Sequence, residues 1–406
     1  MEPFQIRVPD EVLDDLRWRV AATRWPRELP ADRADRGDST RENTGNGVGD
    51  AWSHGTETGL LRDLLAYWEK QFDWRAVERR LNARSQFTAD VAGGRVHFLL
   101  EKGDGPDPFP LVITHGWPSS FLEMERLSWL LAHPDNPADA FDVVVPSLPG
   151  FGFSDPPAAG EALSPRTADR WAVLMRDVLG YTRFGAVGGD IGAGVTTRLG
   201  MQHPELVVGI HVDPDGVAQA TPYLTDPDAA PPLSEAERSY LAADGAWVAE
   251  HGGYAHLQGT RPRTLAFGLT DSPAGLAAYL VEKFRAWSDC GGDVLSRFDR
   301  DDLLATVTLY WVTDTIGSSF LPYYDGRHRG EPAPRLRVDV PVAVALWHEP
   351  NLTAPPRELA ERAMNVTRWT QMPRGGHFAA AEEPELLAED IRTFFRPLRT
   401  RTSRRS

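Results

Sequence analysis

The stretch Val187-Gly188-Gly189-Asp190-Ile191-Gly192-Ala193-Gly194 decides the fold that we expect for this chain. An apolar run at residues 184–187 leads into it, and residues 193–201 continue it with the pattern of a helix. Small residues around one acidic side chain indicate a nucleophile elbow, a sharp strand-to-helix turn with a reactive group at its tip. Glycine suits such a turn because a Cβ would oppose its backbone angles and close packing. We therefore predict that Asp190 is a nucleophile, with an ordinary turn and a helix N-cap as the alternative.

The chemistry of a nucleophilic aspartate defines which partner residues are needed. A carboxylate that attacks a saturated carbon forms an ester, which water must then hydrolyse with the help of a base. Glu349 and His377 follow Asp190 in the order nucleophile, acid, base that an elbow fold requires. Two glycines before His377 can bring its imidazole over the elbow, and Glu349 would hold the ring in one tautomer. Asp213 or Asp215, which follow an earlier apolar run, could supply the acid instead.

The spacing of apolar residues indicates a sheet whose strands alternate with helices. Two runs within residues 86–99 flank the turn Ala92-Gly93-Gly94 and predict a hairpin. Later runs are short, apolar and rich in β-branched residues, as buried parallel strands require; they are residues 111–114, 141–145, 184–187, 207–212, 342–346 and 366–369. Helix-like sequence separates these runs, so we predict an α/β doubly wound sheet.

The same patterns divide the chain into five segments. Residues 1–85 lack a strand pattern long enough to stand alone and predict an N-terminal helical arm. Residues 86–213 and 338–398 form the two parts of the α/β core. Residues 214–337 are mostly helical, with helices predicted over residues 234–247, 273–287 and 301–313. We expect this lid to cover the C-terminal ends of the strands, where ligands bind. Residues 399–406 form a basic tail, which we expect to be a frayed end.

Composition narrows the classes of partner. The chain has 406 residues, of which 41% are hydrophobic, and 43 Lys and Arg against 58 Asp and Glu give a net charge of −15. That charge argues against nucleic acid or an anionic membrane as a partner. The only cysteine is Cys290, which excludes an internal disulfide and a cysteine-based metal site. We see no metal-ligand cluster, phosphate-binding loop, signal peptide or membrane span, and therefore expect a soluble cytoplasmic protein without metal or cofactor; a homo-oligomer is possible.

The motif His115-Gly116-Trp117-Pro118 directly follows one of the predicted strands. In elbow folds the loop after this strand supplies one backbone N–H of the oxyanion hole, and the residue after the nucleophile supplies the other. Trp117 and Ile191 are the candidates for these two donors. For the His115 side chain we favour a structural role in the turn.

The motifs together resemble an epoxide hydrolase of the microsomal type, the branch with an N-terminal helical arm before an α/β-hydrolase core. The resemblance covers nearly the whole chain, and its most specific part is Arg374-Gly375-Gly376-His377-Phe378-Ala379-Ala380. It implies that Asp190 opens an epoxide, that water is the second substrate and that the product is a vicinal diol. The family holds the epoxide oxygen with two lid tyrosines, and Tyr254 and Tyr323 match their positions. A phenol with a pKa of about 10 stays protonated at neutral pH and can protonate the departing alkoxide.

Three departures from the family pattern affect the expected pocket. Ile191 stands where tryptophan is usual, Glu349 lacks the usual preceding Phe-Pro-x, and Asp314 stands where glycine is common. Tyr324, beside Tyr323, leaves a purely structural role open for the latter. We interpret the departures as signs of a specialised pocket for a bulky aromatic or polycyclic epoxide, such as a natural-product intermediate.

Two other functions compete with this interpretation. A dehalogenase uses the same kind of Asp nucleophile and His–acid pair on the same fold, but a leaving halide needs no proton, so lid tyrosines would be idle. A non-catalytic small-molecule binder would keep the pocket without turnover. We rank the binder low because Asp190, His377 and Glu349 are all present.

Overall fold

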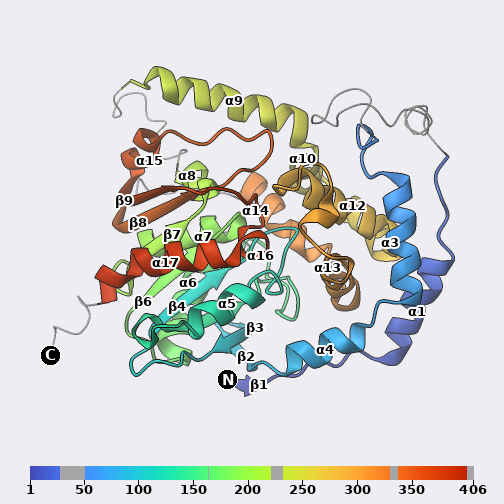
Figure 1. The fold of residues 1–406 in the computed structure, drawn as a ribbon, viewed down its shortest axis with the longest axis horizontal. Helices are drawn as coiled ribbons and strands as arrows, with labels where there is room; N and C mark the ends of the chain where they lie inside the picture. The colour runs from blue at the N-terminus through green and yellow to red at the C-terminus, as the bar shows by residue number, and fades with distance from the viewer. Residues whose placement is uncertain (28–50, 163, 221–231, 330–336, 400–406) are drawn as a thin grey trace.

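One mixed sheet forms the centre of the computed structural model, which describes residues 1–27, 51–162, 164–220, 232–329 and 337–399. The described strands form a nine-stranded sheet in the order β1-β2-β3-β5-β4-β6-β7-β8-β9 (Figure 1). Their bounds are β1 (Glu2–Pro3), β2 (Gln86–Val91), β3 (Gly94–Glu101), β4 (Phe109–Thr114), β5 (Phe141–Pro146), β6 (Phe184–Gly188), β7 (Val207–Val212), β8 (Val338–Leu346) and β9 (Met364–Gln371).

The sheet changes from antiparallel to parallel at β5. Strands β1, β2 and β3 pair antiparallel, and β3 pairs antiparallel with β5. All pairs from β5 through β4, β6, β7 and β8 to β9 are parallel. The predicted hairpin is present, with Ala89 opposite Val96 and with Ala92 and Gly93 both at positive φ in the turn. Strands β5, β6 and β7 are buried at every residue, as expected for parallel strands covered on both faces.

Helices cover both faces of the sheet. Leu127 of α5 (Glu125–Ala132) and Phe395 of α17 (Pro384–Arg399) share a hydrophobic cluster with Leu111 on one face. Trp171 of α6 (Ser164–Val173) and Leu199 of α7 (Ile191–Gln202) belong to the cluster on the other face. Figure 1 shows α5 and α17 in front of the sheet. Two shorter helices complete this part of the structure, α15 (Arg357–Ala363) and α16 (Ala379–Glu382).

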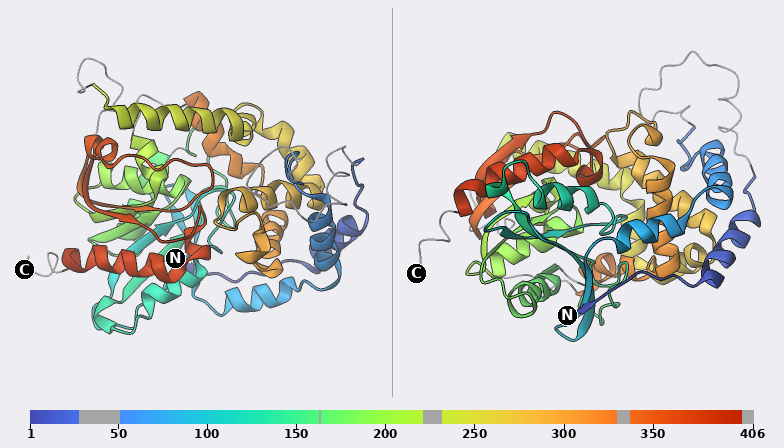
Figure 2. Two further views of the ribbon diagram at one scale, coloured as in Figure 1. Left: turned by 45° about the horizontal axis from the view of Figure 1, so that its top comes forward. Right: turned by 60° about the horizontal axis from the view of Figure 1, so that its bottom comes forward.

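The N-terminal arm contributes α1 (Asp10–Ala21), α3 (Thr58–Lys70) and α4 (Trp74–Asn82). The side chains of Glu57 and Asp73 cap α3 and α4 by accepting backbone N–H groups of the first turns. The arm packs on the lid, where the Trp68 indole N–H donates to the Thr308 hydroxyl at 3.0 Å and the Thr56 hydroxyl donates to the Ala278 carbonyl at 2.7 Å. Figures 1 and 2 show the blue arm beside lid helices α12 and α13.

The described part of the lid is helical and consists of α8 (Pro214–Ala220), α9 (Glu235–His251), α10 (Gly253–Thr260), α11 (Pro262–Asp271), α12 (Pro273–Trp287), α13 (Arg300–Thr313) and α14 (Leu321–Arg329). It lies over the C-terminal ends of the strands, because the Tyr310 hydroxyl donates to the Ser119 carbonyl after β4 and the Ser318 hydroxyl to the Gly150 carbonyl after β5. Asp314, where the family commonly has glycine, ends α13 in the left-handed conformation with φ 52°. Aspartate tolerates that conformation better than most side chains.

Four lid helices, α8, α10, α11 and α14, are absent from the sequence-based expectations. Each is short, and glycines within α10 and α14 weaken the helical pattern that a sequence displays. Pro262 at the first position of α11 is the signal that could have revealed its start. Arg399, which we assigned to the tail, ends α17 and donates to the carbonyls of residues 138–140, whereas residues 400–406 lie outside the described residues.

Candidate active site

Asp190 lies at the tip of the turn between β6 and α7, in the position that the elbow motif predicts. Its backbone has φ 53° and ψ −126°, a conformation that residues other than glycine rarely adopt. The turn is packed so closely that a Cβ on Gly192 would meet the Thr114 carbonyl oxygen at 2.0 Å, and one on Gly188 would meet the Gly192 carbonyl oxygen at 2.2 Å. Only glycine fits at these positions, and the strained turn pushes the Asp190 side chain toward the lid-facing edge of the sheet.

Two neighbouring loops hold the elbow. The Trp117 backbone N–H donates to Asp190 Oδ1 at 2.8 Å. The Asp190 backbone N–H donates to Asp213 Oδ2 at 3.0 Å. Ile191 begins α7, and the N–H groups of a first helical turn have no acceptor within the helix. Of the two backbone donors expected for an oxyanion hole, Trp117 therefore contacts the Asp190 carboxylate, and Ile191 follows Asp190 at the start of α7.

Glu349 and His377 come together on the other side of Asp190. His377 Nδ1 lies 2.9 Å from Glu349 Oε2, and His377 Nε2 lies 3.7 Å from Asp190 Oδ2. The two alternative acids, Asp213 and Asp215, line the same small cavity as Glu349 and His377. Asp213 accepts the backbone N–H groups of Asp190 and Asp215, both at 3.0 Å, and so supports the elbow. Among the candidate acids, Glu349 is thus the one that contacts the imidazole.

The site concentrates acidic groups around one imidazole. Burial disfavours the charged form of His377, but the carboxylates of Glu349 and Asp190 outweigh burial and place its pKa well above the ordinary value. Burial raises the pKa of Asp213 to about 7, and burial together with the neighbouring Asp213 charge raises that of Asp215 well above its ordinary value. In the resting site the surroundings therefore favour the protonated form of both His377 and Asp215.

Tyr254 of α10 and Tyr323 of α14 face Trp117 from the lid. The Tyr254 ring stacks on the Trp117 ring with centroids 5.4 Å apart and planes at 7°, and the Tyr323 ring meets it edge-on at 6.1 Å. Burial and the Asp190 charge hold the pKa of both phenols well above the ordinary value, so both stay protonated. Neither hydroxyl has a hydrogen-bond partner among the described residues. Tyr324 is different, because its ring packs on His328 at 4.4 Å.

Three further residues belong to the site although their sequence context does not reveal them. The Trp287 ring lies 5.0 Å from the rings of both Tyr254 and His377. Tyr279 packs on Trp117 at 5.8 Å, and its hydroxyl accepts a hydrogen bond from the Gln258 amide at 3.2 Å. These contacts join lid and core residues far apart in the chain, and no local pattern encodes them.

His115 has the structural role that we expected. Its Nε2 accepts the Leu148 backbone N–H at 3.2 Å, and burial lowers its pKa to about 4, so the ring is neutral. Within the described ranges, no group of three or more His, Cys, Asp or Glu side chains is placed to hold a metal ion. Nor is any described helix long and apolar enough to cross a membrane.

Known proteins resemble this chain over nearly its whole length. Two family models match, "Epoxide hydrolase N terminus" over residues 1–124 and "alpha/beta hydrolase fold" over residues 110–274. A candidate epoxide hydrolase of Stigmatella aurantiaca is 38% identical over 404 residues, which are 98% of this chain and 86% of the relative. Epoxide hydrolase 1 of Oryctolagus cuniculus is 31% identical and aligns over 97% of this chain and 88% of its own length.

A solved structure extends the likeness to three dimensions. The crystal structure of juvenile hormone epoxide hydrolase from the silkworm Bombyx mori matches with a TM-score of 0.79 and 26% identity, over 99% of this chain and 95% of that chain. The fold, with its elbow and its lid, is therefore the α/β-hydrolase fold that the motifs predicted. The sequence relatives and the structure agree that this chain belongs to the epoxide hydrolases.

Proposed function

We propose that this epoxide hydrolase works through a covalent ester on Asp190 and releases a vicinal diol. The observation that carries the proposal is one carboxylate that accepts the Trp117 N–H and lies 3.7 Å from the His377 imidazole, with two unpartnered phenols packed on Trp117. Because the Trp117 N–H holds Oδ1, Oδ2 is the oxygen left to attack an oxirane carbon. The ring carbon–oxygen bond breaks as the new bond forms, and Tyr254 or Tyr323 donates a proton to the departing oxygen.

The second half-reaction returns Asp190 to its carboxylate. His377, oriented by Glu349, takes a proton from water, and the resulting hydroxide attacks the carbonyl carbon of the ester. The Trp117 and Ile191 N–H groups stabilise the oxyanion, and the diol leaves with an oxygen that came from Asp190. Ester formation also prepares the base: it removes the Asp190 charge that helped to raise the pKa of His377, so the imidazole loses its proton more readily.

A single turnover in water labelled with ¹⁸O tests this covalent route. When enzyme is in excess over an aryl-substituted epoxide, the label should appear in the peptide that contains Asp190, and the first diol should be unlabelled. Label in the first diol would mean that water attacks the epoxide directly, and the ester route would be refuted.

We further propose a bulky epoxide as the substrate. A hollow of about 490 Å³ lies between the arm and the lid, within the size range of pockets for drug-sized ligands. Neither Asp190 nor His377 lines it, but Tyr279 does, and the Tyr279 ring packs on Trp117. The hollow therefore adjoins the reacting centre at one aromatic side chain and offers space for the part of a large epoxide that is not attacked. The Bombyx mori relative is named for juvenile hormone.

Filling the hollow tests the substrate class. Ala278 lines it, and Ala278→Phe should lower kcat/KM for bulky aromatic or polycyclic epoxides while leaving small aliphatic epoxides unaffected. Ala246→Phe, on the exposed side of α9, is the matched control and should change neither. A wild-type preference for small aliphatic epoxides would refute the bulky class.

The cytoplasmic location and any self-association stay predictions, to be checked by fractionation and size-exclusion chromatography.

The dehalogenase alternative has less support. A leaving halide needs no proton donor, whereas two protonated phenols without partners lie above the nucleophile. A non-catalytic binder would have no use for an imidazole placed between two carboxylates. Release of halide from haloalkanes at rates comparable to epoxide opening would reverse this ranking.

A further inference from the structure

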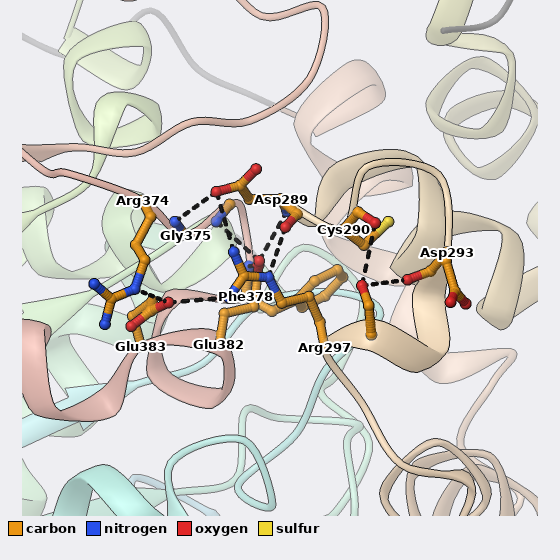
Figure 3. A network of polar contacts seen from close by, with 11 residues as sticks. Asp289, Cys290, Asp293, Arg297, Arg374, Gly375, Phe378, Glu382 and Glu383 are labelled. Atoms are coloured by element: carbon orange, nitrogen blue, oxygen red, sulfur yellow. Dashed lines mark hydrogen bonds and ion pairs between the residues drawn. The ribbon is translucent and has the colours of Figure 1, made fainter. Parts of the chain in front are cut away.

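The loop that carries His377 is held by side chains that the mechanism above does not use. Four consecutive backbone N–H groups, those of residues 375–378, all donate hydrogen bonds. Gly376 donates to Glu382 Oε2 at 3.0 Å and Phe378 donates to Glu382 Oε1 at 3.1 Å. Gly375 donates to Asp289 Oδ2 at 3.0 Å, and His377 itself donates to the Trp287 carbonyl at 3.0 Å. Figure 3 shows Glu382 and Asp289 on the two sides of this loop.

From these contacts we propose that Glu382 is a positioning residue that sets the backbone of His377 and ties it to the lid. The proposal rests on the ester mechanism proposed above, since it assigns Glu382 an effect on one half-reaction only. Glu349 fixes the orientation of the imidazole ring through Nδ1, but it does not fix the position of the His377 backbone. Glu382 holds the residues on both sides of His377, so it governs how far Nε2 is from the ester on Asp190.

The link to the lid passes through the same carboxylate. Glu382 Oε2 also accepts the Asp289 backbone N–H at 2.8 Å, and Asp289 directly continues the loop that begins after Trp287 at the end of α12. Arg297 holds this loop by donating to the Asp289 carbonyl at 2.6 Å, and it reaches Glu383 at 3.1 Å. The base and the lid segment whose Trp287 packs on Tyr254 thus form one connected unit.

Packing leaves this unit little freedom to adjust. A Cβ on Gly376 would meet the Asp289 backbone nitrogen at 2.5 Å, so the His377 loop and the lid loop touch at the backbone. Glu382 is 9% exposed. Water therefore has little access to the three N–H groups that the carboxylate accepts, and cannot easily take its place as their acceptor. Loss of this carboxylate would leave buried backbone donors unpaired, and the loop would have to move to satisfy them.

The role predicts a split between the two half-reactions. Attack on the epoxide needs Asp190 and the lid tyrosines, whereas hydrolysis of the ester needs His377 at the correct distance. A displacement of about 1 Å in a catalytic group can cost about 100-fold in rate. Glu382→Ala should therefore slow ester hydrolysis by about 100-fold and alter ester formation by less than about threefold, so that the ester accumulates in the steady state. Glu382→Gln keeps one acceptor oxygen and should recover part of the rate.

The experiment follows both half-reactions by rapid quenching and intact mass, with an aryl-substituted epoxide and the full-length enzyme. Glu385→Gln is the control: this carboxylate of α17 binds Arg126 at 3.1 Å and none of the four loop N–H groups, and both of its half-reactions should stay within about threefold of wild type. The pH profile of ester hydrolysis gives a second readout. Its acidic limb should move to lower pH in Glu382→Ala, because a displaced imidazole loses part of its interaction with the Glu349 carboxylate.

Four outcomes would overturn the proposal. Ester hydrolysis at the wild-type rate in both Glu382 variants would show that Glu382 does not position His377. Equal slowing of both half-reactions would show a general structural effect, and Glu382→Gln serves for this comparison if Glu382→Ala does not fold. The His377→Gln variant is measured in parallel. An ester that accumulates on His377→Gln but not on the Glu382 variants refutes this inference alone. The absence of an ester on every variant refutes the ester mechanism and the inference together.

Discussion

The two lid tyrosines allow a quantitative prediction, because their rings contribute to packing and their hydroxyls do not. The rings of Tyr254 and Tyr323 pack on Trp117, but neither hydroxyl has a partner among the described residues. Replacement of either tyrosine by phenylalanine keeps the packing and leaves no protein group unpaired. We therefore expect the free energy of unfolding of each variant to stay within about 0.5 kcal/mol of wild type.

The rate should respond very differently. A hydrogen bond to a charged oxygen contributes about 1.5–3 kcal/mol, and about 1.4 kcal/mol corresponds to a factor of ten in rate. Each single variant should therefore form the ester about 10- to 150-fold more slowly, and the double variant should be slower than either. Rapid-quench intact mass on a His377→Gln background measures this step directly, because the ester cannot be hydrolysed there.

Tyr279 provides the matched control. It packs on Trp117 as the other two do, but its hydroxyl already accepts a hydrogen bond from Gln258. Tyr279→Phe should lower stability by about 1 kcal/mol, because the Gln258 amide loses its partner, and should leave ester formation unchanged. Wild-type rates of ester formation in the Tyr254/Tyr323 double variant, with the epoxide as substrate, would refute the assignment of these phenols as proton donors.

Three further predictions concern the acids of the site and the contact between arm and lid. Glu349→Gln should lower the pKa of His377, so the acidic limb of ester hydrolysis should move to lower pH while its plateau rate falls; an unchanged pH profile would contradict the Glu349 assignment. Asp213 has a pKa raised to about 7 in the folded protein, so between about pH 4 and 7 the unfolded chain ionises first and stability falls as pH rises. The melting temperature of Asp213→Asn relative to that of wild type should therefore rise across that window and level off above it, and a difference independent of pH would refute this. Trp68→Phe removes the hydrogen bond to Thr308 and should cost about 1–3 kcal/mol in urea unfolding, whereas equal stability would mean that the bond contributes nothing.

The sequence was most informative where local pattern and physical requirement coincide. The strands of the core, the elbow at Asp190 and the order of Asp190, Glu349 and His377 follow from apolar runs and from glycines that a tight turn requires. Helix α12 matches its predicted bounds of 273–287, because Ser272 caps it and Pro273 opens it. Helix α9 extends four residues beyond the predicted end at 247, since no glycine or proline occurs between Trp247 and Gly252.

Contacts between distant segments were out of reach of such patterns. Asp213 and Glu349 both follow strands, so the sequence could not tell which contacts His377; the answer depends on loop conformations after β7 and β8. The stacking of Tyr254 on Trp117 also depends on how the lid packs on the core. The same holds for the hydrogen bonds by which Glu382 holds the His377 loop. These pairs are separated by more than 100 residues or lie in irregular loops, where residue spacing carries no information about the partner.

The measurement that tests the central claim most directly is the intact mass of the His377→Gln variant after exposure to an aryl-substituted epoxide. Without its base the variant should form the ester and fail to hydrolyse it. We predict a mass gain equal to one whole epoxide, which peptide mapping places on Asp190. A folded variant that shows no adduct while the wild-type enzyme turns over the same epoxide, or an adduct on any other residue, would contradict the account.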